Sequence, residues 1–167
     1  MRISLIASFL IAGLTLAGSA QADTLAYPSS DAASFMVDYP ASWEMTPGEK
    51  TGDYLTLMSD GGTTLMLRTV PGNEDEVQQT IKESIEYVNE NYKDVALSDP
   101  TDSSQQGLTG FYTAGTANEA DLGDVRIAMA WYALKDGTIG EIWFVAPKDD
   151  ADGIGEASAI LDSFRGP

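Results

Sequence analysis

The fold of this chain is decided by one stretch, Phe35-Met36-Val37-Asp38-Tyr39-Pro40-Ala41-Ser42-Trp43-Glu44. The alternation from Phe35 to Tyr39 predicts a strand, and Pro40 ends it because proline restricts the residue before it and fixes its own φ. After a tight Pro-Ala-Ser connection the strand pattern resumes at Trp43. We expect Trp43 to be buried behind this turn, because the preceding strand sets an inward-facing register.

Downstream of this stretch, the pattern predicts a hairpin followed by a long helix. Strands are expected over Tyr54–Ser59 and Thr64–Val70, joined at Asp60-Gly61-Gly62, where the glycines accept positive φ. From Val77 to Tyr92 apolar residues recur at spacings of three and four, which is typical of an amphipathic helix. Asn73 is the expected N-cap of that helix, with carboxylates in its first turn.

The next segments predict more of an antiparallel sheet. Val95–Leu97 is a candidate short strand, and the polar segment Ser98–Gln106 is expected to be a loop. A strand over Leu108–Gly115 is expected to pair with Val125–Lys135 across the polar connection Thr116–Asp124. Because both faces of the second strand are apolar, we predict that it lies centrally and is covered on both sides.

The C-terminal part predicts one more strand and a closing helix. Asp136-Gly137 is a hairpin turn that leads into a strand over Thr138–Ala146. After Pro147, residues Ala151–Phe164 have the apolar spacing of a helix. The order of the elements predicts an α+β fold, in which an antiparallel β-sheet is flanked by two main helices.

The opening stretch closely resembles the F-x-(V/I)-x-Y-P-x-x-W motif of proteins with the Mog/PsbP-like fold, including bacterial DcrB-like envelope proteins. Residues 159–165, Ala-Ile-Leu-Asp-Ser-Phe-Arg, resemble the I-L-x-S-F closing helix of that family, so the resemblance covers Leu25 to Arg165. It implies an α/β/α sandwich without a shared catalytic site. Family members are a photosystem extrinsic subunit, a Ran-binding factor, envelope proteins and secretion-adaptor chaperones, which implies a binding or assembly role.

The first 22 residues have the pattern of a cleaved export signal. Arg2 is positive, Ile3–Ala17 is apolar, and Ser19-Ala20-Gln21-Ala22 ends in the A-x-A pattern of a cleavage site. An apolar segment of about 15 residues is too short to span a bilayer comfortably. We therefore expect cleavage after Ala22, a single domain over residues 23–167, and a periplasmic or secreted protein with no stable membrane anchor.

Composition excludes several classes of function. One of the nine basic residues leaves with the signal, so the remainder carries 8 basic and 26 acidic residues, a net charge near −18. Such a field repels nucleic acid and anionic lipid. The chain has no histidine and no cysteine, which excludes Ser-His-Asp and Cys-His catalysis, His-ligated metals, disulfides and a thioether lipid anchor.

The densest acidic cluster supplies the only candidate metal ligands, Asp149, Asp150, Asp152 and Glu156. It does not match the EF-hand loop, because placing Gly153 at position 6 puts Lys148 at position 1 and Ala159 at position 12. The favoured interpretation is that these acids cap and solvate the start of the last helix. A second acidic loop, Asn118–Asp124, would strengthen the metal hypothesis if it converged with the first.

Six aromatic residues suggest either core packing or a carbohydrate platform. They are Trp43, Trp131, Trp143, Tyr39, Tyr54 and Tyr132. Each lies on strand periodicity that suits a core, and we favour that interpretation.

The leading hypothesis is an exported, non-enzymatic binding or assembly module that acts through contacts with another envelope protein and needs no cofactor. The first alternative is a cation- or small-ligand-binding protein that uses the acidic loops. The second is a hydrolase built from paired carboxylates, which work as acid and base without histidine.

The A-x-A ending generates the first prediction. The intact mass of the exported protein should correspond to a chain that begins at Asp23. Recovery of a protein that retains residues 1–22 in the membrane fraction would contradict it.

Overall fold

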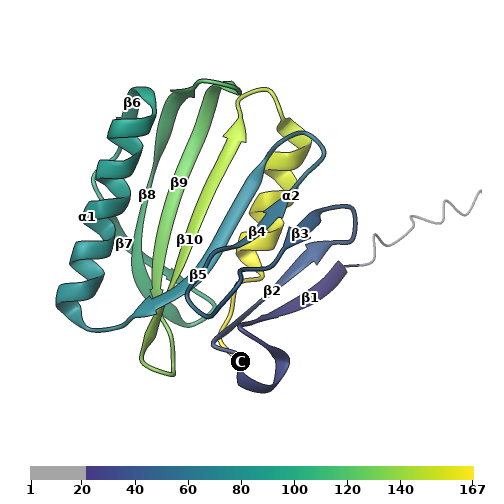
Figure 1. The fold of residues 1–167 in the computed structure, drawn as a ribbon, viewed down its shortest axis with the longest axis vertical. Coiled ribbons are helices and arrows are strands. Elements are labelled where there is room, and N and C mark those ends of the chain that lie inside the picture. Colours follow the sequence, from purple (N-terminus) through teal and green to yellow (C-terminus); the bar gives the residue numbers. More distant parts are fainter. Residues whose placement is uncertain (1–21) are drawn as a thin grey trace, which may run out of the picture.

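A computed structural model describes residues 22–167 and shows an antiparallel sheet between two helices (Figure 1). The first strands are β1 (Ala22–Tyr27) and β2 (Phe35–Pro40), separated by a 3-10 turn, η1 (Ser30–Ala32). The sheet strands are β3 (Glu44–Thr46), β4 (Leu55–Met58), β5 (Thr64–Pro71), β6 (Lys93–Leu97), β7 (Thr101–Gln105), β8 (Leu108–Glu119), β9 (Gly123–Ala133) and β10 (Thr138–Pro147). The helices are α1 (Glu74–Asn91) and α2 (Ala151–Asp162).

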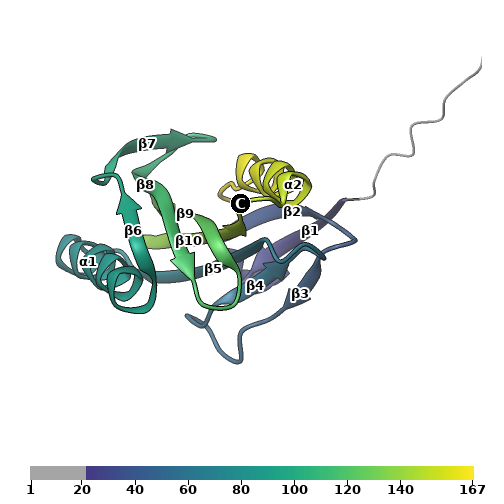
Figure 2. The same ribbon diagram turned by 90° about the horizontal axis from the view of Figure 1, so that it is seen from above.

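The main sheet has eight strands in the order β3-β4-β5-β10-β9-β8-β6, and β7 pairs with the first half of β8. β1 and β2 form a separate antiparallel ribbon. Helix α1 covers one face of the sheet, whereas α2 and the ribbon cover the other, as the view from above shows (Figure 2). The predicted α+β fold with two flanking helices is confirmed, and β9 lies centrally between β8 and β10 as expected.

The opening stretch forms the structure that its pattern predicts. Phe35 and Val37 are fully buried, and the Trp43 N–H donates to the Pro40 carbonyl at 3.0 Å, which closes the turn. Trp43 is only 4% exposed, and its indole Nε1 donates to Glu156 at 2.6 Å. The predicted burial of Trp43 is therefore confirmed.

The two family motifs, far apart in sequence, contact each other directly. Both guanidinium Nη atoms of Arg165 lie 3.0 Å from the carboxylate oxygens of Asp38, in the bidentate geometry that suits arginine and carboxylate. Ser163 Oγ accepts from the Asp38 N–H at 2.7 Å, and Met36 exchanges backbone hydrogen bonds with Arg165. The end of the chain is thereby fastened to the first predicted strand.

The segment Ser98–Gln106, predicted as a loop, contains strand β7, which pairs with β8 from Thr101↔Tyr112 to Gln105↔Leu108. The prediction was wrong because β7 is a polar edge strand. Its pairing uses backbone groups, which are the same for every residue, so it leaves no apolar alternation in the sequence.

Two other boundaries differ from the sequence-based expectation. The predicted connection Thr116–Asp124 is much shorter, because β8 continues to Glu119 and β9 begins at Gly123. Ala117 is buried within this extension, and Asn118 donates to Asp124 across the pair at 3.1 Å. Strand β1, which no pattern predicted, pairs with β2 along its length.

Other local predictions are confirmed. Asn73 caps α1 by accepting from the Glu76 N–H at 2.9 Å. The turn at Gly62 and the turn at Gly137 both require positive φ, and glycine occupies both positions. Of the six aromatic residues, Trp43, Trp131, Trp143 and Tyr132 are buried in the two cores, which confirms the core interpretation for these four.

The burial of Trp43 generates a stability prediction. Trp43→Ala should lower the free energy of unfolding by about 3 to 5 kcal/mol, through lost transfer free energy and the cavity left behind. Trp43→Phe should cost less, because it keeps most of the buried volume, although it also loses the bond to Glu156. Urea titration measures both, and the exposed Met58→Ala is the control, expected within about 0.5 kcal/mol of wild type.

Candidate functional site

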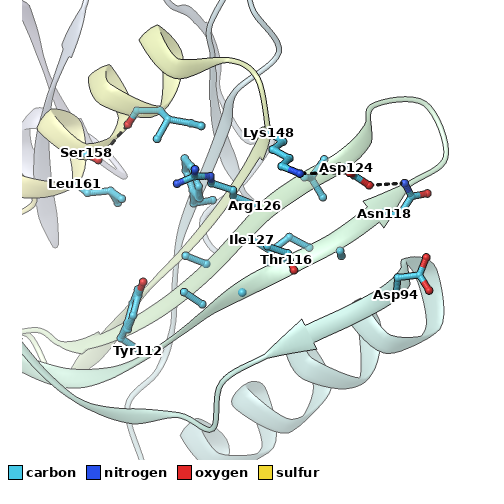
Figure 3. Close-up of a pocket in the computed structure, with 17 residues that line it drawn as sticks. Asp94, Tyr112, Thr116, Asn118, Asp124, Arg126, Ile127, Lys148, Ser158 and Leu161 are labelled. Carbon is cyan, nitrogen blue, oxygen red and sulfur yellow. Dashed lines mark hydrogen bonds and ion pairs between the residues drawn. The ribbon is translucent and has the colours of Figure 1, made fainter.

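A concavity of about 620 Å³ runs between α2 and strands β8 and β9 (Figure 3). A second hollow of about 210 Å³ continues it toward Gln105 and shares Tyr112, Ala128, Phe144, Ser158 and Leu161 with it. We call this continuous feature the α2 groove. Its volume lies in the range of sites that bind small ligands or peptide side chains.

The groove exists because α2 leaves the outer strands uncovered. The helix packs against β2 and β10, whereas β8 and β9 continue beyond it (Figure 2). Two of the floor side chains on the outer strands are small, since Ala114 and Ala128 are direct partners in the register and both line the groove. Ser158 and Leu161 of α2 form the opposite wall, and Tyr112, 41% exposed, stands at one end.

The charges in the groove are uneven. Lys148 Nζ lies 3.8 Å from Asp124, so these two charges pair on the rim. Arg126 is exposed, and among the described residues it makes no ion pair and no side-chain hydrogen bond. Figure 3 places its guanidinium over the groove on the side of α2. A chain with a net charge of −17 thus presents an uncompensated cation above an apolar floor.

The acidic residues singled out from the sequence lie at the beginning of α2 and do not gather around a common point. Asp150 is the N-cap of α2: its carboxylate accepts from the Gly153 N–H at 3.1 Å and from Thr63 Oγ1 at 2.6 Å. Glu156 accepts from Trp43, as described above. Asp149 and Asp152 are exposed, and neither makes a side-chain hydrogen bond within residues 22–167. Capping explains the position of Asp150, as the sequence suggested.

The second acidic loop is a tight turn. Glu119 Oε2 accepts from the backbone N–H groups of Asp121 and Leu122, both at 2.8 Å, and these bonds lower the pKa of Glu119. The Lys148 N–H donates to the Asp124 carbonyl at 2.9 Å, so the turn lies beside the segment that leads into α2. In the part of the chain that the structure describes, no three acidic groups come close enough to hold a metal ion.

Sequence reasoning missed the side chain that accepts the most hydrogen bonds within residues 22–167. Glu141, on central strand β10, is fully buried, and its two oxygens accept five hydrogen bonds. The donors are Ser84 Oγ at 2.9 Å, Trp131 Nε1 at 3.1 Å, Trp143 Nε1 at 3.2 Å, Tyr54 Oη at 3.0 Å and Arg68 Nε at 2.5 Å. Burial first, and the charge of Glu141 next, raise the pKa of Tyr54 far above its usual value, so Tyr54 remains a donor.

Comparison with known proteins supports the fold but does not identify a function. No protein-family model and no curated protein sequence matches this chain. The structure is similar to cyanobacterial PsbP (CyanoP) from Synechocystis sp. PCC 6803, with a TM-score of 0.62 and 11% identity over 93% of this chain and 98% of that one. It is also similar to LpqN of Mycobacterium tuberculosis, with a TM-score of 0.58 and 13% identity over 88% and 91%.

A third similar structure is the Ran-binding protein Mog1p of Saccharomyces cerevisiae, with a TM-score of 0.53 and 12% identity over 89% of this chain and 96% of that one. The chain also matches a Bacteroides thetaiotaomicron protein at 15% identity and a TM-score of 0.52, over 80% of its own length but only 45% of the other. These likenesses show that the chain has the Mog/PsbP-like fold that its opening and closing motifs predicted.

Asp150 generates a prediction about acid stability. Its hydrogen bond from Thr63 is the main cause that lowers its pKa. A folded-state pKa below the unfolded value stabilises the protein at pH values above the unfolded pKa, and this contribution is lost as the pH falls through the folded pKa. Asp150→Asn should therefore be less stable than wild type at pH 7, and its stability should fall less steeply below about pH 4.

Urea titration at a series of pH values measures this difference. Asp149→Asn is the matched control, because it removes the adjacent carboxylate, which makes no side-chain hydrogen bond among the described residues. Parallel pH profiles for Asp150→Asn and wild type would show that the cap does not depend on the charge.

Proposed function

We propose that this protein is an exported, non-enzymatic binding module that holds a segment of another cell-envelope protein in the α2 groove. The occupant we infer is an extended segment with an apolar residue followed or preceded by a carboxylate. The apolar part would lie on the floor formed by Ala114, Ala128 and Phe144, and the carboxylate would pair with Arg126. The observation that carries this proposal is the unpaired Arg126 above that floor.

Charge complementarity favours an acidic segment. Of the basic residues in the described part of the chain, only Arg126 and Lys148 line the groove, and the net charge of the chain is −17. The chain as a whole is negative, so it does not attract anions at long range. Arg126 therefore favours a partner whose bound segment places a carboxylate directly beside its guanidinium.

The structure offers little to a hydrolase. The chain has no histidine. Glu141, the one buried carboxylate within residues 22–167, accepts five hydrogen bonds, so its lone pairs are engaged by the fold itself. Similar folds also support binding, since LpqN is involved in cell envelope biogenesis and Mog1p is a Ran-binding protein. No helix in the described part of the chain is long and apolar enough to cross a membrane.

Site-specific photocrosslinking in intact cells tests the proposal. A photoreactive phenylalanine analogue at Tyr112, in the groove, should crosslink to one envelope protein. The matched control is the same analogue at Tyr87, which is also an exposed tyrosine, at 54%, but lies on α1 at the opposite face. A synthetic peptide that covers the crosslinked segment should then bind the purified domain.

Two variants connect the crosslink to the groove. Arg126→Glu reverses the charge and should weaken peptide binding by roughly tenfold or more, as expected for the loss of one charge-assisted hydrogen bond. Ala114→Trp fills the floor and should weaken binding at least as much, because it excludes the apolar residue of the peptide. Unchanged melting temperatures would show that both variants fold. Crosslinking of equal yield at Tyr112 and Tyr87, or peptide binding that survives both variants, would contradict the proposal.

A further inference from the structure

A second cavity lies on the opposite face of the sheet, between α1 and β5. Its volume is about 370 Å³, within the usual range for small-molecule sites. Three aromatic rings, Tyr54, Tyr87 and Trp143, contribute to its walls together with Met66. Tyr87 meets Trp143 edge to face, with ring centroids 5.7 Å apart, so this aromatic wall is packed in a defined geometry.

Arg68 is held in this cavity by groups that fix its orientation. Its Nε lies 2.5 Å from Glu141 Oε2, and its guanidinium carbon lies 4.3 Å from the centre of the Tyr54 ring. The Glu141 side chain is completely buried, whereas 30% of the Arg68 side chain is exposed. A guanidinium that is already oriented loses little conformational entropy when it binds a ligand.

Most of the donors on Arg68 are available. A guanidinium carries five N–H groups, and the bond from Nε to Glu141 is the one hydrogen bond that the Arg68 side chain makes among the described residues. The four Nη hydrogens therefore have no protein acceptor in residues 22–167. Glu141 cannot serve them further, because four other donors share its oxygens.

The same arrangement selects against a cationic ligand. Aromatic walls often bind cations, but Arg68 already occupies the face of Tyr54 and brings its own positive charge into the cavity. Glu83 of α1 also lines the cavity, but it is exposed at the rim. Solvent therefore screens the repulsion between its charge and a bound anion. The chemistry inside the cavity is therefore that of an anion-binding donor beside apolar rings.

We propose that this cavity binds a small organic monocarboxylate with an aromatic or aliphatic body. Its carboxylate accepts hydrogen bonds from the Arg68 Nη groups, and its body packs against Tyr87, Trp143 and Met66. This site goes beyond the proposed function, because it lies on the α1 face and shares no lining residue with the α2 groove.

The test uses 3-phenylpropionate as the probe and 3-phenylpropionamide as its neutral isostere. Binding is followed by NMR shifts of the Trp143 indole N–H and by intrinsic fluorescence. The carboxylate should bind saturably and at least roughly tenfold more tightly than the amide, as expected for a hydrogen bond between charged groups. Glu83→Gln should tighten binding slightly, because it removes a negative charge from the rim.

Three variants locate the site. Arg68→Gln should weaken binding of the carboxylate by roughly 10-fold to 100-fold. That change also leaves Glu141 without its arginine, so a second variant, Thr80→Trp, is needed. Thr80 lines the cavity but makes no bond to Glu141. A tryptophan at this position should fill the cavity and abolish binding, and it should leave the fold intact. Arg126→Gln, in the α2 groove, is the matched control and should bind the probe like wild type.

Several results would overturn the proposal. Two of them concern the ligand: equal affinity for the acid and the amide, or tighter binding of phenylethylammonium than of 3-phenylpropionate. The other two concern the place of binding: binding that survives Thr80→Trp, or the same loss of affinity in Arg126→Gln as in Arg68→Gln. Each leaves the proposed function standing, because crosslinking at Tyr112 and peptide binding are measured on the other face.

Discussion

The rest of the structure depends on the hydrogen bonds that the buried carboxylate of Glu141 accepts. Glu141 lies on the central strand β10 and joins four other segments, because its five donors come from the residue before β4, from β5, from α1, from β9 and from β10 itself. A buried carboxylate is costly unless it is paired and its lone pairs are used. Five donors, one of them an arginine, meet that requirement and fix where α1 lies on the sheet.

The opposite face of β10 shows the complementary constraint. Gly140 precedes Glu141, and a Cβ at Gly140 would lie 2.7 Å from the ring of Phe164. Glycine is needed there so that the closing segment can approach the sheet. The bidentate contact between Arg165 and Asp38 then ties this segment to β2. With α2 held near β2 and β10, the outer strands stay uncovered and the α2 groove results.

The two cavities differ in what the sequence could have revealed. The capping role of Asp150 was predictable, because a cap is a contact between residues three apart. The groove was not, because Tyr112, Arg126 and Ser158 come from three elements and none belongs to a motif. Arg68 and Glu141 were also missed. Each is a single charged residue within a strand, and a single charge gives no sign of a partner 73 residues away.

The amino-acid sequence by itself determined the features that depend on neighbouring residues: strand and helix periodicity, the glycine turns, the helix caps and the burial of Trp43 behind Pro40. These follow from local backbone preferences and from which face of an element is apolar. Only the tertiary structure decided that β7 and β1 are strands and that Glu141 gathers Tyr54, Arg68 and Ser84. Backbone pairing at an edge is indifferent to side-chain type, and the partners of a buried charge are selected by the packing of the whole chain.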